Sequence, residues 1–165
     1  MIQGEKELEK ALDRKARIDM AKAIEKGITL VQENAQAECP VHDGELEGSI
    51  YIDINMKEES VEGICYTDKE YAHFVEFGTG PKGQENHEGI SPDVAVAYTQ
   101  SPWWIHESQI DREVAEKYHF FGIDTPQGRF YQCTGQPAKP FLYPALKNNE
   151  EEVARIVREE LQKQL

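Results

Sequence analysis

Apolar side chains recur every three or four residues from Leu8 to Ala35, and the positions between them are mostly charged or polar. This spacing predicts a long helix with an apolar stripe on one side and Lys, Glu, Arg and Gln on the other. The stripe consists of Leu8, Leu12, Ala16, Met20, Ile24, Ile28, Val31 and Ala35. We expect Pro40 to end the helix, because proline cannot donate a backbone hydrogen bond. We also expect residues 1–11, which place few heavy side chains on the stripe, to project from the body of the protein.

A β-hairpin is predicted after this helix. Isoleucines alternate with other residues from Ile50 to Ile54, as in a strand with one buried face. Residues 55–60 are polar and predict a turn, and residues 61–67 return as a second strand.

The next stretch, YAHFVEFGTG, combines a short apolar run with two glycines. Its apolar residues, Tyr71 to Phe77, fit one or two helical turns, and it stops at Gly78 and Gly80, which permit the positive φ of a sharp reversal. We therefore expect a short buried helix with an abrupt exit. Glu76 must face solvent, cap backbone N–H groups or meet a cation, because an unpaired carboxylate in a core is costly. Thr79 can add a local hydrogen bond.

The second half of the chain alternates loops with short elements. Residues 81–100 show no usable period, which predicts a long flexible loop. A strand is expected to start at Trp103, a short helix to span residues 111–118 and another strand to span residues 128–134. A last helix is expected to have Pro144 near its first turn. Its apolar stripe is Leu142, Leu146, Val153, Val157, Leu161 and Leu165.

This order of elements predicts an α+β fold. An antiparallel sheet should carry the long N-terminal helix and the C-terminal helix packed on one face. The length of 165 residues fits a single domain, residues 1–165. The formal charge of −13 argues against a protein that wraps nucleic acid. The apolar runs are too short for a bilayer span and the first residues too charged for a signal peptide, so we expect a protein kept in a cytoplasm without a membrane partner.

Candidate chemistry is sparse. His73 and Glu76 lie three residues apart and can share a helix face as metal ligands, but the other candidate ligands match no zinc spacing. Cys133 can pair with His106 or His119 as a nucleophile, since such partners meet only in the fold. No phosphate loop, nucleophile elbow or dinucleotide motif is present. We expect no catalytic residue, metal or cofactor, with a small metal-dependent or thiol hydrolase and a peptide-binding adaptor as the alternatives.

Two adjacent tryptophans stand out in the second half. Trp103 and Trp104 should point to opposite sides of their strand, so that one can enter the core while the other remains for a partner. The alternative is that the neighbouring long loop covers both. Three widely spaced cysteines, Cys39, Cys65 and Cys133, fit reduced thiols better than a disulfide framework.

Four blocks of the sequence together resemble a known family, the small minor tail-component proteins of long-tailed bacteriophages. The blocks are NAQAECPVHDGELEGSI, YAHFVEFGTG, PWW and GQPAKPFLYPAL, which occur in the family's order before a terminal helix. The chain departs from the family's pattern at His42–Asp43, which stand where an acidic residue and Thr are usual. It departs again in residues 108–129, a longer connection than is typical of the family.

The resemblance implies a virion structural protein that acts in tail completion or head-tail joining. The family has no catalytic residues, and its members are expected to form a homo-oligomeric ring with other tail or head-tail connector proteins as partners. The protein is then expected in the virion, and in the host cytoplasm during assembly, without sequence-specific nucleic acid binding. The structural or interface candidates are Tyr71, Glu76, Phe77, Gly78, Thr79, Gly80, Trp103, Trp104, Pro140 and Phe141.

Overall fold

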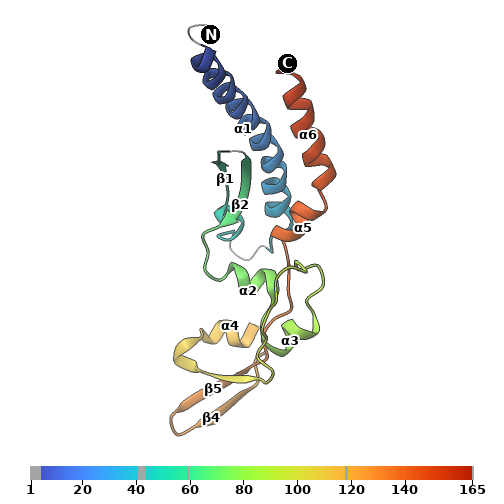
Figure 1. The fold of residues 1–165 in the computed structure, drawn as a ribbon. Coiled ribbons are helices and arrows are strands. Elements are labelled where there is room, and N and C mark those ends of the chain that lie inside the picture. Colours follow the sequence, from blue (N-terminus) through green and yellow to red (C-terminus); the bar gives the residue numbers. More distant parts are fainter. Residues whose placement is uncertain (1–4, 41–43, 59, 118, 165) are drawn as a thin grey trace. The chain divides into compact units, whose positions relative to one another are not determined.

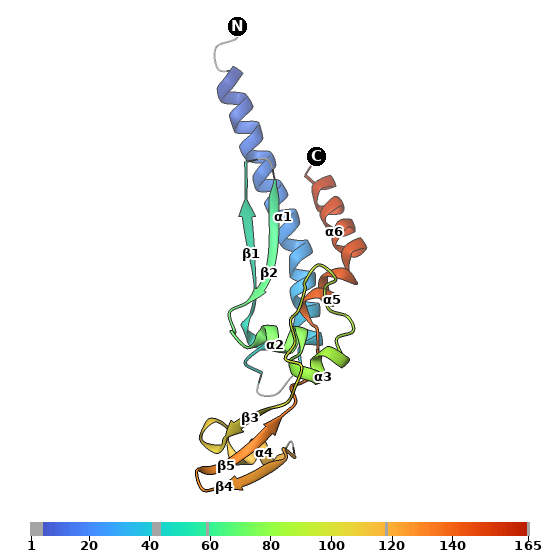
Figure 2. The same ribbon diagram turned by 60° about the horizontal axis from the view of Figure 1, so that its bottom comes forward.

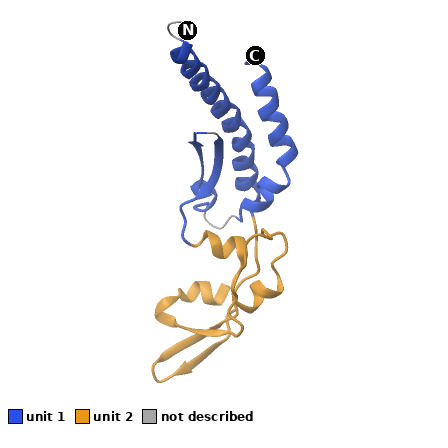
Figure 3. Ribbon diagram, viewed as in Figure 1, with its two compact units in different colours: residues 1–70, 141–165 blue, residues 71–140 orange. Residues whose placement is uncertain are grey.

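The chain forms two compact units in a computed structural model that describes residues 5–40, 44–58, 60–117 and 119–164. Unit 1 combines residues 1–70 with residues 141–165, and unit 2 is the stretch between them, residues 71–140 (Figure 3). The His42–Asp43 departure, the first four residues of the expected projection and Leu165 lie outside the described residues.

Unit 1 is built on one long helix, α1, Glu5–Glu38. A hairpin of β1, Ile50–Met56, and β2, Val61–Thr67, packs on α1, preceded by a short 3-10 turn, Glu47–Ser49. The helices α5, Leu142–Lys147, and α6, Glu150–Gln162, also pack on α1, and Figures 1 and 2 show α6 running alongside it.

Glycines set how closely these elements approach α1. A Cβ atom at Gly27 would lie 3.1 Å from methyl groups of both Val153 and Val157 on α6. A Cβ atom at Gly63 on β2 would lie 2.8 Å from the Cγ2 of Ile24 on α1. Both positions exclude a larger side chain without movement of a neighbour, because protein interiors are close-packed.

The predicted helix and hairpin of unit 1 are confirmed. The helix α1 ends at Glu38, two residues before Pro40, and β1 pairs antiparallel with β2 from Ile50↔Thr67 to Met56↔Val61. The connecting turn is shorter than predicted, since β1 continues to Met56.

The prediction of one continuous C-terminal helix is wrong, because α5 and α6 are separate helices. The break falls at Asn148 and Asn149, and the side chain of Asn149 donates a hydrogen bond from Nδ2 to the carbonyl of Ala145 (2.8 Å). Asparagine side chains compete with the helical backbone for hydrogen bonds. A new helix then begins at Glu150, with three glutamates in its first turn that favour the positive end of the helix dipole.

Unit 2 combines three short helices with a sheet, over the residues that the structure describes. Its helices and strands are α2, Ala72–Phe77; α3, Gly80–Glu85; β3, Trp103–His106; α4, Arg112–Lys117; β4, Gly122–Thr125; and β5, Gly128–Cys133. A 3-10 turn, Glu107–Gln109, follows β3. The strands form an antiparallel sheet in the order β3-β5-β4. The five strands found among the described residues therefore belong to two sheets, and the α+β class is confirmed.

Unit 2 differs from the sequence prediction in two elements. The helix α3 occupies the start of the predicted loop 81–100, while residues 86–102, all of which the structure describes, connect it to β3 without a helix or strand. The strand β4 was missed, although its turn to β5 contains Pro126, and Thr125 closes that turn with a hydrogen bond from Oγ1 to the carbonyl of Gly128 (2.8 Å). None of the helices in the described ranges is long and apolar enough to cross a bilayer.

Candidate interaction site

Two segments far apart in the sequence meet in unit 2. Thr79 donates a backbone hydrogen bond to Gln136 (2.9 Å) and accepts one from it (3.1 Å), which forms an isolated antiparallel bridge. Gln136 also donates from Nε2 to the carbonyl of Phe74 (2.8 Å), and Lys139 donates its backbone N–H to the carbonyl of Val75 (2.8 Å). The structure therefore joins YAHFVEFGTG to GQPAKP, and we call residues 78–83 and 134–138 the glycine junction.

Glycine is required at this junction for both conformation and space. The positive φ expected at Gly78 and Gly80 is confirmed, with values of 73° and 60°, and Gly135 has a φ of 81°. A Cβ atom would lie 2.6 Å from the backbone nitrogen of Ala138 if added at Gly78, and 2.8 Å from the Trp103 ring if added at Gly80. The backbones meet here at distances that no side chain allows.

The helix α2 buries a different face from the one predicted. Ala72 and Glu76 are buried, Glu76 at 4% exposure, whereas Tyr71 and Phe74 are exposed. The solvent-facing option for Glu76 is therefore wrong, and so is the expectation that Tyr71 is covered. Hydrophobicity is a one-way guide, since much of any protein surface is apolar.

The remaining candidate residues fall in different places. Phe77 is half-buried, and its carbonyl accepts a hydrogen bond from the hydroxyl of Tyr98 (2.8 Å). The ring of Tyr98 stacks on His87 (5.7 Å between centroids), so two residues of the 86–102 connection are tied to the end of α2. Pro140 is half-buried in unit 2, and Phe141 is completely buried in unit 1, where it precedes α5.

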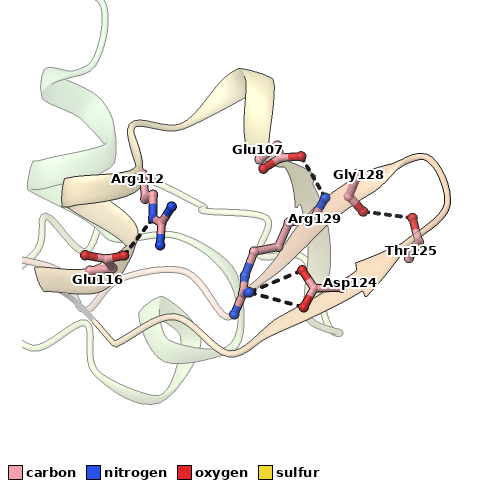
Figure 4. A network of polar contacts seen from close by, with 7 residues as sticks. All are labelled: Glu107, Arg112, Glu116, Asp124, Thr125, Gly128 and Arg129. Carbon is pink, nitrogen blue, oxygen red and sulfur yellow. Dashed lines mark hydrogen bonds and ion pairs between the residues drawn. The ribbon is translucent and has the colours of Figure 1, made fainter.

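One side of the β3-β5-β4 sheet forms an open polar cavity with α4, about 680 Å³ in volume. Figure 4 shows the polar contacts among residues that line it. Arg112 donates from Nε to Glu116 (2.8 Å), and Arg129 donates from Nη1 to both carboxylate oxygens of Asp124 (3.2 and 3.3 Å). Glu107 accepts the backbone N–H of Arg129 (2.9 Å). The hydrogen bond with Glu116 raises the pKa of Arg112. Each arginine already has a carboxylate partner: the Arg112–Glu116 pair lies within α4, and the Arg129 contacts join β5 to β4 and to the 3-10 turn.

The other side of this sheet is mainly aromatic, and three of its large side chains are exposed. Residues paired across the strands, Trp104↔Gln132, His106↔Phe130 and Ile123↔Phe130, lie on one face, because alternate side chains of a strand share a face. We call Trp104, His106, Phe121, Ile123 and Phe130 the aromatic face. Trp104, Phe121 and Ile123 are 43%, 63% and 39% exposed. The rings of Trp104 and Phe121 lie 6.2 Å apart and those of His106 and Phe130 5.0 Å apart.

The two tryptophans differ as their alternation predicted. Trp103 is half-buried and lies against Gly80, whereas Trp104 is exposed on the aromatic face. The alternative in which the long loop covers both rings is wrong. Sequence reasoning identified Trp104 but missed Phe121 and Ile123, because they meet it only through the pairing of β4 with β5.

Two of the arrangements considered for catalysis, Cys133 with His106 and a metal site on His73 and Glu76, do not form in the described residues. His106 pairs with Phe130 and Trp103 with Cys133, so His106 and Cys133 lie about 10 Å apart along the strands. The ring of His106 instead contacts Ser108 Oγ (2.8 Å) and the carbonyl of Gln127 (3.0 Å). His73 is exposed while Glu76 is buried, and the described residues contain no group of three potential metal ligands. Burial raises the pKa of the Cys65 thiol to about 11, which keeps it protonated.

Comparison with known proteins gave one family. Residues 3–78 match the model of the family described as "Bacteriophage HK97-gp10, putative tail-component". The match spans α1, the β1-β2 hairpin and α2, and it confirms over this stretch the resemblance inferred from the sequence. No curated protein and no solved structure gave a match.

Proposed function

We propose that this chain, whose residues 3–78 match the phage tail-component family, is a virion structural protein acting in tail completion or head-tail joining. The single observation that carries the proposal is this match, which covers the principal helix and hairpin of unit 1 and runs into the glycine junction. The separation of His106 from Cys133 and the protonated state of Cys65 support a structural rather than an enzymatic role.

The working form in this proposal is a homo-oligomeric ring that contacts other tail or connector proteins. The aromatic face is the surface we assign to such contacts. Its five residues include no acidic or basic side chain other than His106, in a chain with a formal charge of −13. Copies of an acidic protein repel one another, so an uncharged apolar surface is where a neighbour can approach at least electrostatic cost.

Deleting the gene from the phage genome that carries it tests the proposal. We expect the lysate to contain heads and tails that are unjoined, or tails of abnormal length, in negative-stain electron microscopy, together with loss of plaques. Plaques and complete particles at the normal yield would overturn the proposed role.

Complementation of the deletion then tests the aromatic face. A plasmid copy with Trp104→Ser and Phe121→Ser should fail to restore complete particles. A copy with Tyr66→Ser, which removes an aromatic residue of the same 43% exposure from the hairpin, should restore them as the unmodified gene does. Equal rescue by both variants would exclude the aromatic face as a required contact.

A further inference from the structure

The first part of α1 has an unusual environment for a helix. Every residue from 5 to 18 is exposed, including Leu8 at 62%, Leu12 at 59% and Ile18 at 43%. An isolated helix of this length is only marginally stable in water, since most helical stability in proteins comes from packing of an apolar face. This segment lacks such packing within unit 1, over the residues that the structure describes.

The path of the apolar stripe around α1 explains why Leu8 and Leu12 do not pack in the core of unit 1. Its members are mostly four residues apart, and a four-residue step advances about 40° around a helix of 3.6 residues per turn. Over the 27 residues from Leu8 to Ala35 the stripe therefore turns by about 180°. Val31 and Ala35 are buried in unit 1, and Leu8 consequently lies on the opposite side of the helix. Leu8, Ala11, Leu12 and Ile18 lie on a second, mainly apolar stripe, about 120° wide, which also includes Lys15.

Charge is segregated along the same segment. Residues 5–9 hold three glutamates and one lysine, a net charge of −2. Residues 10–17 hold four basic residues and one aspartate, a net charge of +3, in a chain that is otherwise strongly acidic. An open, mainly apolar depression lies beside the basic part and is lined in part by Arg14, Ile18 and Met56.

We propose that residues 5–18 of α1 pair antiparallel with the same segment of a second copy of this chain. The antiparallel orientation puts the acidic part of each helix against the basic part of the other, whereas a parallel orientation would put like charges together. The second stripe, with Leu8 and Leu12, supplies the apolar seam.

This contact goes beyond the proposed function and does not depend on it. A two-fold contact is satisfied by two copies, so it cannot build a ring, which requires a head-to-tail surface elsewhere on the molecule. The pairing therefore predicts a dimer of the isolated protein, held by a surface that is distinct from the aromatic face.

Sedimentation equilibrium of the purified full-length chain tests the pairing with two charge reversals. One variant carries Lys10→Glu, Arg14→Glu and Arg17→Glu, and another carries Glu5→Lys, Glu7→Lys and Glu9→Lys. Each should raise the dissociation constant of the dimer about tenfold or more, because attractive pairs become repulsive. A variant with all six changes exchanges the charges of residues 5–9 with those of residues 10–17. The dissociation constant of its dimer should lie within about threefold of that of the unmodified chain.

A third reversal provides the control. Lys139→Glu, Arg158→Glu and Lys163→Glu change the net charge as much as the basic-run variant does, at exposed positions outside this segment, and should leave the dimer unchanged. Circular dichroism checks that each variant keeps its helix. A monomeric unmodified chain would overturn the pairing, and so would an equal effect of the control. The pairing would also be overturned if the variant with all six changes dimerised as weakly as the two three-residue variants. The acidic partner of the basic part would then lie elsewhere in the chain. None of these readouts depends on a role in the phage.

Discussion

Replacing Gly78 with alanine should destabilise unit 2 by about 3 kcal/mol. Gly78 has a φ of 73° and a ψ of 176°, a region open almost only to glycine, where other residues incur strain of about 1–3 kcal/mol. The added Cβ atom would also lie 2.6 Å from the nitrogen of Ala138 and 2.9 Å from the carbonyl oxygen of Gln136. Both are backbone atoms that cannot rotate away, and overpacking of this kind costs about 1–3 kcal/mol.

Tryptophan fluorescence during a urea titration measures this effect. Trp103 and Trp104 are the two tryptophans of the chain and both lie in unit 2, so the signal follows that unit. A unit of roughly 70 residues has an unfolding free energy of about 4–10 kcal/mol. A loss of about 3 kcal/mol in the free energy of unfolding should lower the urea midpoint by roughly 2 M. If unit 2 has a stability at the low end of the range, the variant should be largely unfolded in buffer.

Gly122→Ala is the matched control in the same unit. Gly122 has no positive φ, and the atoms nearest to its added Cβ belong to the guanidinium end of the flexible Arg129 side chain. We expect this change to alter the free energy of unfolding by no more than about 0.5 kcal/mol. If Gly78→Ala shifts the midpoint no further than Gly122→Ala does, the junction is not held by close backbone contact and the reasoning is wrong.

Three further predictions concern the surface, the long connection and the thiols. The formal charge of −13 should prevent measurable binding of duplex DNA at about 0.15 M salt in a fluorescence anisotropy titration. Tight, salt-sensitive binding would contradict the expectation that this protein does not bind nucleic acid. Limited proteolysis should cut first within residues 86–97. Tyr98→Phe removes the hydrogen bond to the carbonyl of Phe77 and should speed that cleavage. Resistance of this segment to the protease would refute its predicted flexibility. With a thiol pKa of about 11, Cys65 should react with iodoacetamide at pH 8 several hundred times more slowly than free cysteine. The rate of this reaction should rise about tenfold per pH unit up to pH 10. Peptide mass spectrometry measures the rate.

Periodic and local signals predicted much of the fold. The spacing in α1, the alternation from Ile50 and the glycines after Phe77 each act over a few residues, and the structure has a helix, a hairpin and a reversal at these places. The break between α5 and α6 at Asn149 was not predicted, because Leu146 and Val153 are seven residues apart and this spacing keeps the helical period across the break. The strand β4 was not predicted, because only one of its four residues is apolar and it therefore shows no alternating pattern.

The candidate site was less predictable because it depends on contacts between distant segments. The sequence indicates that Gly78 permits a reversal, but not that Gln136 and Ala138 fill the space where its side chain would be. The aromatic face requires the registers of β3 and β4 against β5, and a shift of one residue would turn Phe121 and Ile123 to the other side. The exposure of Tyr71 and the burial of Glu76 depend likewise on tertiary packing, which overrides the hydrophobicity of a six-residue helix.

The hydrogen bond from Lys139 to Val75 has a consequence for how the chain can fold. Unit 1 needs both ends of the sequence, and the intervening 71–140 segment would be a long loop to close if it were unstructured. The bond holds two points near the ends of that segment together, at 2.8 Å. Once unit 2 has folded, the connection that α5 and α6 must span shortens from roughly 70 residues to about 7, which lowers the entropy cost of closure by about 2 kcal/mol. Docking of the C-terminal helices on α1 therefore costs less entropy when unit 2 is already folded.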